Sequence, residues 1–281
     1  MASEQFVSHT QNREDVVLNR VFGTMPQGRY VEVGANDPRV DSITYGFYRR
    51  GWSGLEIEAN PAFAEAFRQS RPRDTFLQAA ITDSDEPTIT FHVIPDTGLS
   101  TLVDSVSAGH ASDGWTIVDQ TVPTARLGAT IQEAGLEAED IHFLVIDTEG
   151  SELQVLRSID LRAIRPWVLI VEATAPTSTV QTHQAWEPLV LGSGYQFCLF
   201  DGLSRFYVAD ERAAELKEQL SYPACVLDNF IPYDEYRLLA ERDELEKSLV
   251  EARERIDALE KTLSWRLTKP LRAVRGLRLR S

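Results

Sequence analysis

Acidic side chains follow two apolar runs near the N-terminus, where β-strands would end. The first run, Tyr30-Val31-Glu32-Val33, leads into Gly34-Ala35-Asn36-Asp37, and the second, Leu55-Glu56-Ile57, ends at Glu58, 24 positions after Gly34. A Rossmann-type sheet holds the adenosine part of a ligand with a strand, a glycine turn and an acid at the tip of the next strand. The acid accepts hydrogen bonds from the ribose hydroxyls. The spacing therefore predicts a site for an adenosine-containing cofactor.

The chemistry of the glycine loop separates two classes of cofactor. A pyrophosphate must approach backbone N–H groups at a helix N-terminus, so dinucleotide sites favour several glycines and no nearby acids. This loop has one glycine and two carboxylates, Glu32 and Asp37, which would repel a diphosphate and attract a sulfonium and an α-ammonium group. S-adenosylmethionine therefore fits better than NAD. For this segment alone, an ordinary buried strand that ends in a Gly/Asn/Asp turn is the alternative.

A second group of acids follows later strands. Asp147 and Glu149 come directly after an apolar run, and Glu172 ends the next one. Ligands in open α/β sheets bind beyond the carboxyl ends of the strands. We therefore expect Asp147 and Glu149 to line the same crevice as Glu32 and Glu58, on the side of the acceptor.

Methyl transfer to a hydroxyl group requires a group that removes a proton. Because a sulfonium already carries a good leaving group, the enzyme mainly aligns donor and acceptor, and a carboxylate, a histidine or a divalent metal deals with the hydroxyl proton. The candidates are Asp147, Glu149, Glu172 and His183, and the three carboxylates could hold Mg²⁺ through oxygen ligands. The sequence leaves the metal and the base as open alternatives. A solvated strand end for Glu172 and a helix-surface position for His183 are the simpler interpretations.

Alternating strands and helices must position these residues. Apolar runs predict strands at 30–33, 54–58, 75–79, 89–93, 143–147, 167–172, 195–200 and 205–208. Helical patterns fall between them, at 14–22, 41–50, 61–68, 125–134, 151–157 and 182–191. Strands separated by helices indicate crossover connections and a parallel sheet covered on both faces.

One turn breaks the alternation. Phe200-Asp201-Gly202-Leu203 predicts a hairpin with a type I′ turn, because Asp-Gly tolerates positive φ angles. The last strand should therefore run antiparallel in an otherwise parallel sheet. The predicted fold is an α/β class I methyltransferase, a Rossmann-like sandwich with a seven-stranded, mostly parallel sheet. A dinucleotide dehydrogenase would keep its core strands parallel.

Composition and charge exclude several classes of protein. The chain has 281 residues and a net charge of −15, which argues against a nucleic-acid surface over the whole molecule. Two cysteines without metal-site or disulfide spacing fit a reducing cytoplasm. No signal sequence or spanning stretch is visible, so we expect a cytoplasmic protein whose contact with a membrane, if any, is peripheral.

The composition changes after the predicted sheet. We expect a methyltransferase domain at 1–229, a coiled-coil helix at 230–264 and a basic amphipathic tail at 265–281. The helix has 4-3-4-3 spacing at Leu238, Arg242, Leu245, Leu249, Ala252, Ile256, Leu259 and Leu263. Its partner could be a second copy, another protein such as a glycosyltransferase, or a groove on its own domain. The tail has six Lys/Arg and no acid, which suits an anionic bilayer surface or a disordered segment.

Segments from about residue 8 to 210 match one family in order. They are Gln11-Asn12-Arg13-Glu14-Asp15, Tyr30-Val31-Glu32-Val33-Gly34-Ala35, Ser42, Thr44, Phe47-Tyr48, Gly51-Trp52-Ser53-Gly54, Glu56-Ile57-Glu58-Ala59-Asn60-Pro61, Ser100-Thr101-Leu102, Ile146-Asp147-Thr148-Glu149-Gly150-Ser151-Glu152, Glu172-Ala173-Thr174, His183, Trp186-Glu187, and Phe200-Asp201-Gly202-Leu203-Ser204-Arg205-Phe206-Tyr207-Val208. In these segments the chain resembles the FkbM-type methyltransferases, S-adenosylmethionine-dependent enzymes that mostly O-methylate sugars or polyketide-like acceptors.

The resemblance implies roles for particular residues. Donor-binding residues would be Gln11, Asp15, Glu32, Gly34, Asn36, Asp37, Thr44, Glu58, Asn60 and Ala80, with Gln11, Asp15 and Thr44 near the methionine end. Asp147 and Glu149 would face the acceptor. Asn36 and Pro38 stand where many methyltransferases have glycine, so the path of this loop is open.

The segment 264–272 is similar to one found behind coiled coils in bacterial enzymes that build cell-surface polysaccharide. Together these features predict an O-methyltransferase that acts on a sugar hydroxyl, in a glycan or its lipid-linked precursor at the inner face of the cytoplasmic membrane. The alternative is a catalytically idle scaffold that recruits glycan-assembly enzymes through its coiled coil.

Overall fold

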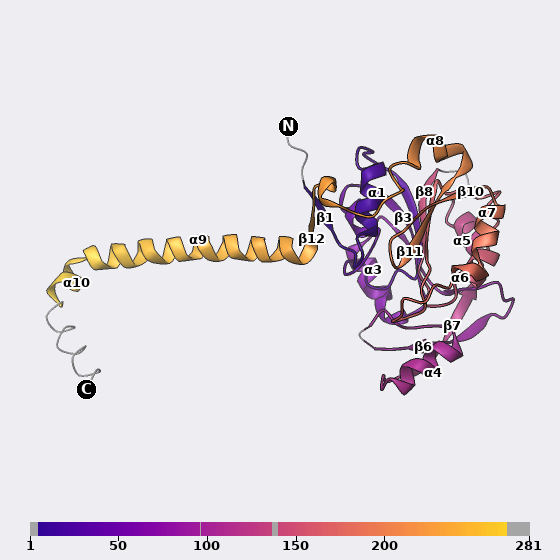
Figure 1. Cartoon of the computed structure of the whole chain (residues 1–281). Helices are drawn as coiled ribbons and strands as arrows, with labels where there is room; N and C mark the ends of the chain where they lie inside the picture. Colours follow the sequence, from indigo (N-terminus) through magenta and orange to yellow (C-terminus); the bar gives the residue numbers. More distant parts are fainter. Residues whose placement is uncertain (1–4, 96, 137–139, 269–281) are drawn as a thin grey trace. The chain divides into compact units, whose positions relative to one another are not determined.

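The computed structural model describes residues 5–95, 97–136 and 140–268 (Figure 1). The chain divides into two compact units, residues 1–230 and 231–281. The strands are β1 (Phe6–Ser8), β2 (Arg29–Val33), β3 (Ser53–Glu58), β4 (Thr75–Gln78), β5 (Ala80–Ile81), β6 (Thr88–Val93), β7 (Val118–Ala125), β8 (Ile141–Ile146), β9 (Val168–Glu172), β10 (Tyr195–Phe200), β11 (Ser204–Ala209) and β12 (Phe230–Pro232). The α-helices are α1 (Glu14–Phe22), α2 (Tyr45–Arg49), α3 (Ala64–Ser70), α4 (Asp104–Ser112), α5 (Leu127–Glu133), α6 (Glu152–Arg157), α7 (Glu187–Gly192), α8 (Ala213–Leu216), α9 (Tyr233–Lys261) and α10 (Leu263–Leu267).

A seven-stranded sheet forms the centre of the first unit. Its order is β10-β11-β9-β8-β2-β3-β4, in which β11 pairs antiparallel with both neighbours and the pairs from β9 to β4 are parallel. Every residue of β8 and β9 is buried, as expected for strands that are covered on both faces. The prediction of a mostly parallel sheet with a reversed last strand is confirmed.

Side chains alternate between the two faces of the sheet. On β8, Leu144 and Ile146 belong to one apolar cluster, with residues of α5, α6 and α7, whereas Phe143 and Val145 belong to another, with residues of α1 and α2. Figure 1 shows α1 on one side of the sheet and α5, α6 and α7 on the other. Because β2, β3, β8 and β9 run parallel, their carboxyl ends lie at the same edge of the sheet.

The hairpin between β10 and β11 is confirmed, but the predicted type I′ turn is wrong. Such a turn needs positive φ at both central residues. Gly202 has φ 109°, whereas Asp201 is not among the described residues with positive φ. The side chain of Asp201 instead accepts hydrogen bonds from the backbone N–H groups of Leu203 and Ser204, at 2.9 and 2.7 Å.

A second, three-stranded sheet was not expected. The predicted strand 89–93 corresponds to β6, which pairs with β7 in the order β5-β7-β6 and not with the main sheet. The sequence of β7 contains Pro123 and lacks regular alternation, so its pattern predicted no strand. The predicted helix 41–50 also begins late, at Tyr45, and Asp41 has φ 56°.

A buried ion cluster made by Arg71 ties the first strands together. The guanidinium pairs with Glu56 and with Asp74, whose carboxylate lies 2.7 Å from Nε, and all three side chains are fully buried. Arg71 also donates to the hydroxyl of Thr44, which lies 2.7 Å from Glu32. Acids in the interior of the sheet thus share one buried cation.

The second unit contains the long helix α9. It has no buried residue, and its exposed apolar side chains include Leu238, Leu245, Leu249, Ile256 and Leu259. The helix ends at Lys261, and Thr262 caps α10 by accepting a hydrogen bond from the backbone of Trp265. The coiled coil stays a prediction, and most of the predicted basic tail lies outside the described residues. Within the described part of the chain, no helix combines the length and apolar character needed to cross a bilayer.

We expect Arg71→Met to lower the free energy of unfolding by about 3–5 kcal/mol, because it leaves Glu56 and Asp74 buried without their cation. The matched control is Arg68→Met, since Arg68 pairs with Glu65 on an exposed helix surface and such pairs contribute less than about 1 kcal/mol. Urea unfolding measures both. Equal losses for the two variants would contradict the role of Arg71.

Candidate active site

A cavity of about 400 Å³ opens at the carboxyl ends of β2, β3, β8 and β9. Ten of the fourteen predicted site residues line it: Gln11, Glu32, Gly34, Asn36, Glu58, Asn60, Ala80, Asp147, Glu149 and Glu172. Segments separated by more than 100 residues in the sequence thus meet in one cavity.

The other four predicted residues lie outside the lining. Asp15 accepts hydrogen bonds from Ser8, the backbone of His9, and Thr10, and so shapes the loop that carries Gln11. Asp37 accepts from two backbone N–H groups of its own turn.

Thr44 and His183 also act outside the cavity wall. Thr44 lies between Glu32 and Glu56 in the buried ion cluster. His183 lies 3.8 Å from Glu187, which also accepts hydrogen bonds from Arg205 and Tyr207. Neither side chain belongs to the described lining of the cavity.

The glycine loop is held by two features of its backbone. Gly34 has φ 86°, and a Cβ there would lie 1.6 Å from the carbonyl oxygen of Asp147, so only glycine fits. Asn36 has φ 47°, and its N–H donates to a carboxylate oxygen of Glu58 at 2.8 Å. The loop after β2 is therefore in backbone contact with the loop after β8 and tied to the tip of β3.

Glu58 keeps acceptor capacity for a ligand. One carboxylate oxygen accepts from Asn36 and the other from the N–H of Asn60, at 2.6 Å. Burial, the largest influence, raises the pKa of Glu58. Each ionised oxygen can accept more than one hydrogen bond, so Glu58 can still accept from hydroxyl groups in the cavity.

Acidic side chains dominate the lining. Among the described residues that line the cavity there are seven acids and no Lys, Arg or His: Glu14, Glu32, Asp41, Glu58, Asp147, Glu149 and Glu172. The sequence interpretation missed two of these as site residues, Glu14 and Asp41. Glu14 directly follows Gln11-Asn12-Arg13, so its place in that motif was the available signal.

Glu14 is buried with one unsatisfied oxygen. Its side chain is 3% exposed, and Oε2 has no hydrogen-bond partner. Burial, with a smaller contribution from Asp201, raises the pKa of Glu14 to about 8. A cationic group of a ligand would satisfy this carboxylate.

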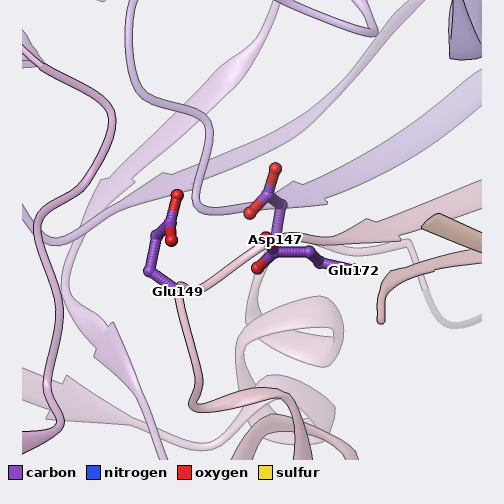
Figure 2. A group of neighbouring side chains, drawn as sticks. All are labelled: Asp147, Glu149 and Glu172. Carbon is purple, nitrogen blue, oxygen red and sulfur yellow. The ribbon is translucent and has the colours of Figure 1, made fainter. Parts of the chain in front are cut away.

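Asp147, Glu149 and Glu172 form a second acidic group, which we call the carboxyl cluster (Figure 2). Carboxylate oxygens of the three residues lie within 4.8 Å of one another. Figure 2 shows Asp147 and Glu149 on the loop after β8, with Glu172 approaching Asp147 from β9. Burial and the neighbouring acids raise the pKa of each carboxyl.

The backbone of this loop is fixed from two sides. Glu152 accepts hydrogen bonds from the backbone N–H groups of Thr148 and Gly150 and from the hydroxyl of Thr148. Thr101 donates to the carbonyl of Glu149 at 2.8 Å. These bonds hold Glu149 at φ 52°, a conformation that non-glycine residues seldom adopt.

The comparison with protein families gives one match. The profile described as Methyltransferase FkbM domain matches residues 32–197, which is more than half of the chain and includes most of the cavity lining. No curated protein sequence matches the chain significantly.

Solved structures give remote matches. A TehB-like SAM-dependent methyltransferase from Corynebacterium glutamicum is 9% identical, with a TM-score of 0.38, over 69% of this chain and 87% of that one. Precorrin-6y C5,15-methyltransferase from Geobacter metallireducens is 10% identical, with a TM-score of 0.38, over 74% and 93%. CalO1, a methyltransferase in calicheamicin biosynthesis solved in its SAH-bound form, is 11% identical, with a TM-score of 0.35, over 70% and 54%.

Glu14→Gln should stabilise the protein more at pH 8 than at pH 5. Between the ordinary pKa of about 4.5 and the folded pKa of about 8, the unfolded state loses the Glu14 proton while the folded state retains it. Wild-type stability therefore falls as pH rises through this window, and glutamine removes that loss. We expect a gain of about 1–3 kcal/mol at pH 8, measured by urea unfolding of the free protein. Parallel pH curves for wild type and Glu14→Gln would exclude this effect.

Proposed function

Because the chain belongs to the FkbM family of S-adenosylmethionine-dependent methyltransferases, we propose that it methylates a hydroxyl group of a sugar, in a cell-surface glycan or its lipid-linked precursor. The observation that carries the proposal is the cavity at the carboxyl ends of the strands. Its described lining has seven acids and no basic side chain. This charge favours a cationic donor and polar, hydroxyl-bearing acceptors over phosphate-bearing ligands.

The cavity suits S-adenosylmethionine in volume and in the chemistry of its lining. A volume of about 400 Å³ lies within the range of small-molecule pockets. The missing side chain at Gly34 lets the loop lie directly against the backbone of Asp147. Glu58 would accept hydrogen bonds from the ribose hydroxyls, and Glu14 and Glu32 would attract the positively charged methionine end.

The carboxyl cluster would remove the proton from the acceptor hydroxyl group. Bound S-adenosylmethionine supplies an electrophilic methyl group, whose bond to sulfur breaks as the acceptor oxygen bonds to the carbon. The hydroxyl proton must leave in the same step, and Asp147, whose pKa burial raises to about 7, would accept it in its ionised form. The backbone contact between Gly34 and Asp147 would place this base beside the donor loop.

Further polar side chains support a sugar as the acceptor. Ser100, Thr148, Thr174, Thr177 and Ser178 also line the cavity. Their hydroxyl groups both donate and accept hydrogen bonds, as sugar hydroxyls require. The glycan setting is supported by the sequence similarity of the segment 264–272 to polysaccharide-assembly enzymes.

Calorimetry of the full chain tests the donor. S-adenosylmethionine should bind, and Glu58→Ala should weaken binding about 10-fold or more, because two charge-assisted hydrogen bonds to the ribose are lost. Glu65→Ala, an exposed acid on α3, is the matched control and should bind like wild type. Binding of NAD in place of S-adenosylmethionine would refute the assignment.

The acceptor requires an experiment in cells. Deletion of the gene should remove single-methyl mass increments from one sugar of the surface glycan, detected by mass spectrometry. Wild type should restore them, and full-length Asp147→Asn should not, because the step loses its proton acceptor. Restoration by Asp147→Asn, together with loss of the increments when residues 235–281 are deleted, would favour a scaffold without catalytic activity.

A further inference from the structure

We propose that the carboxyl cluster of Asp147, Glu149 and Glu172 binds a divalent cation of the Mg²⁺, Mn²⁺ or Ca²⁺ type beside the acceptor. The inference rests on the proposed function and extends it, since the cation would contact the acceptor hydroxyl.

The spacing suits a cation bound by oxygen atoms. The three carboxylates each offer an oxygen within 4.8 Å of the other two. Two oxygens on opposite sides of one cation are about 4.0–4.2 Å apart for Mg²⁺ and about 4.6–5.2 Å apart for Ca²⁺. A single ion can therefore contact all three residues with little or no movement of the side chains.

Unsatisfied oxygens point to the same ligand independently of the spacing. Glu172 is only 4% exposed, it lines the cavity, and its Oε2 has no hydrogen-bond partner. Oε2 of Glu149 is likewise buried and without a hydrogen-bond partner. A proton shared between Asp147 and Glu172, which lie within hydrogen-bond reach of each other, would reduce the charge there, but it would leave Oε2 of Glu149 without a partner, whereas a cation contacts all three residues.

The protein itself offers no cation there. No Lys, Arg or His belongs to the described cavity lining, and Arg71 is engaged by Glu56 and Asp74. Glu152, the nearest additional acid in the sequence, already accepts three hydrogen bonds through one oxygen. No described residue of the lining therefore neutralises the charge of the carboxyl cluster, and a bound cation would do so.

Three carboxylates leave coordination positions open. Hard divalent cations take six or more oxygen ligands, and the remaining positions face the cavity, where water or an acceptor hydroxyl can bind. A coordinated hydroxyl has a lower pKa than a free one, so its proton is lost more readily to a neighbouring carboxylate or to water. Oxygen-only ligands argue against a zinc site.

Mn²⁺ titration of the metal-free full-length protein, followed by electron paramagnetic resonance, tests the inference. Wild type should bind one Mn²⁺ saturably below about 1 mM, with competition by Mg²⁺ or Ca²⁺. Glu172→Gln and Asp147→Asn should each weaken this binding at least about 10-fold. Glu65→Gln, an exposed acid, is the control and should bind like wild type. Thermal unfolding without metal checks folding, and neither cluster variant should melt below wild type, because each removes a buried carboxylate.

The results separate this inference from the proposed function. Absence of saturable Mn²⁺ binding, or binding equally strong in wild type and both cluster variants, would overturn the cation site. If S-adenosylmethionine still binds in the same samples, the donor assignment stands without a metal. If Mn²⁺ binds and S-adenosylmethionine does not, the cation site stands and the proposed function fails.

Discussion

Buried carboxyl groups without a described basic partner govern the edge of the sheet at which the cavity opens. A buried carboxylate is costly unless it is paired or fully hydrogen-bonded. Glu14 and Glu172 are each at most 4% exposed and have an oxygen without a hydrogen-bond partner. A ligand that brings positive charge relieves this cost, and the relief adds to its binding energy. The same edge thus suits a sulfonium, an ammonium group or a metal ion.

Acids within the sheet, in contrast, are paired with a buried cation of the protein. Glu56 lies in the middle of β3 and is fully buried, but Arg71 pairs with it and with Asp74. Thr44 extends this network to Glu32, whose side chain also reaches the cavity. One cation therefore compensates the acids that hold the strands together, whereas the acids at the strand ends have raised pKa values and no described basic partner, and a cationic ligand would favour their ionised form.

Backbone packing connects the two halves of the cavity. Gly34 lies against the carbonyl of Asp147, and β2 and β8 are neighbours in the sheet. The loop that would hold the donor and the loop that carries the carboxyl cluster therefore cannot move independently. Glu152 and Thr101 fix the second loop from its other side. Alignment of donor and acceptor follows from this shared backbone.

Much of the fold could be predicted because its signals are local. The strands that end at Val33 and Glu58, the glycine turn between them and the reversed strand after Gly202 all follow from short patterns of residue type. The second sheet could not be predicted, because β7 pairs with β6 despite a proline and an irregular pattern.

The sequence by itself determined the chemical character of the site: acids at the ends of strands, one glycine turn, and thus a cationic cofactor. Only the tertiary structure decided how each acid is used. Asp15 and Glu14 are adjacent in the sequence, yet Asp15 closes a loop through three hydrogen bonds and Glu14 lines the cavity. The physical reason is that the surroundings of a side chain depend on partners far away in the sequence, as Arg71 is for Glu56 and Asp147 is for Gly34.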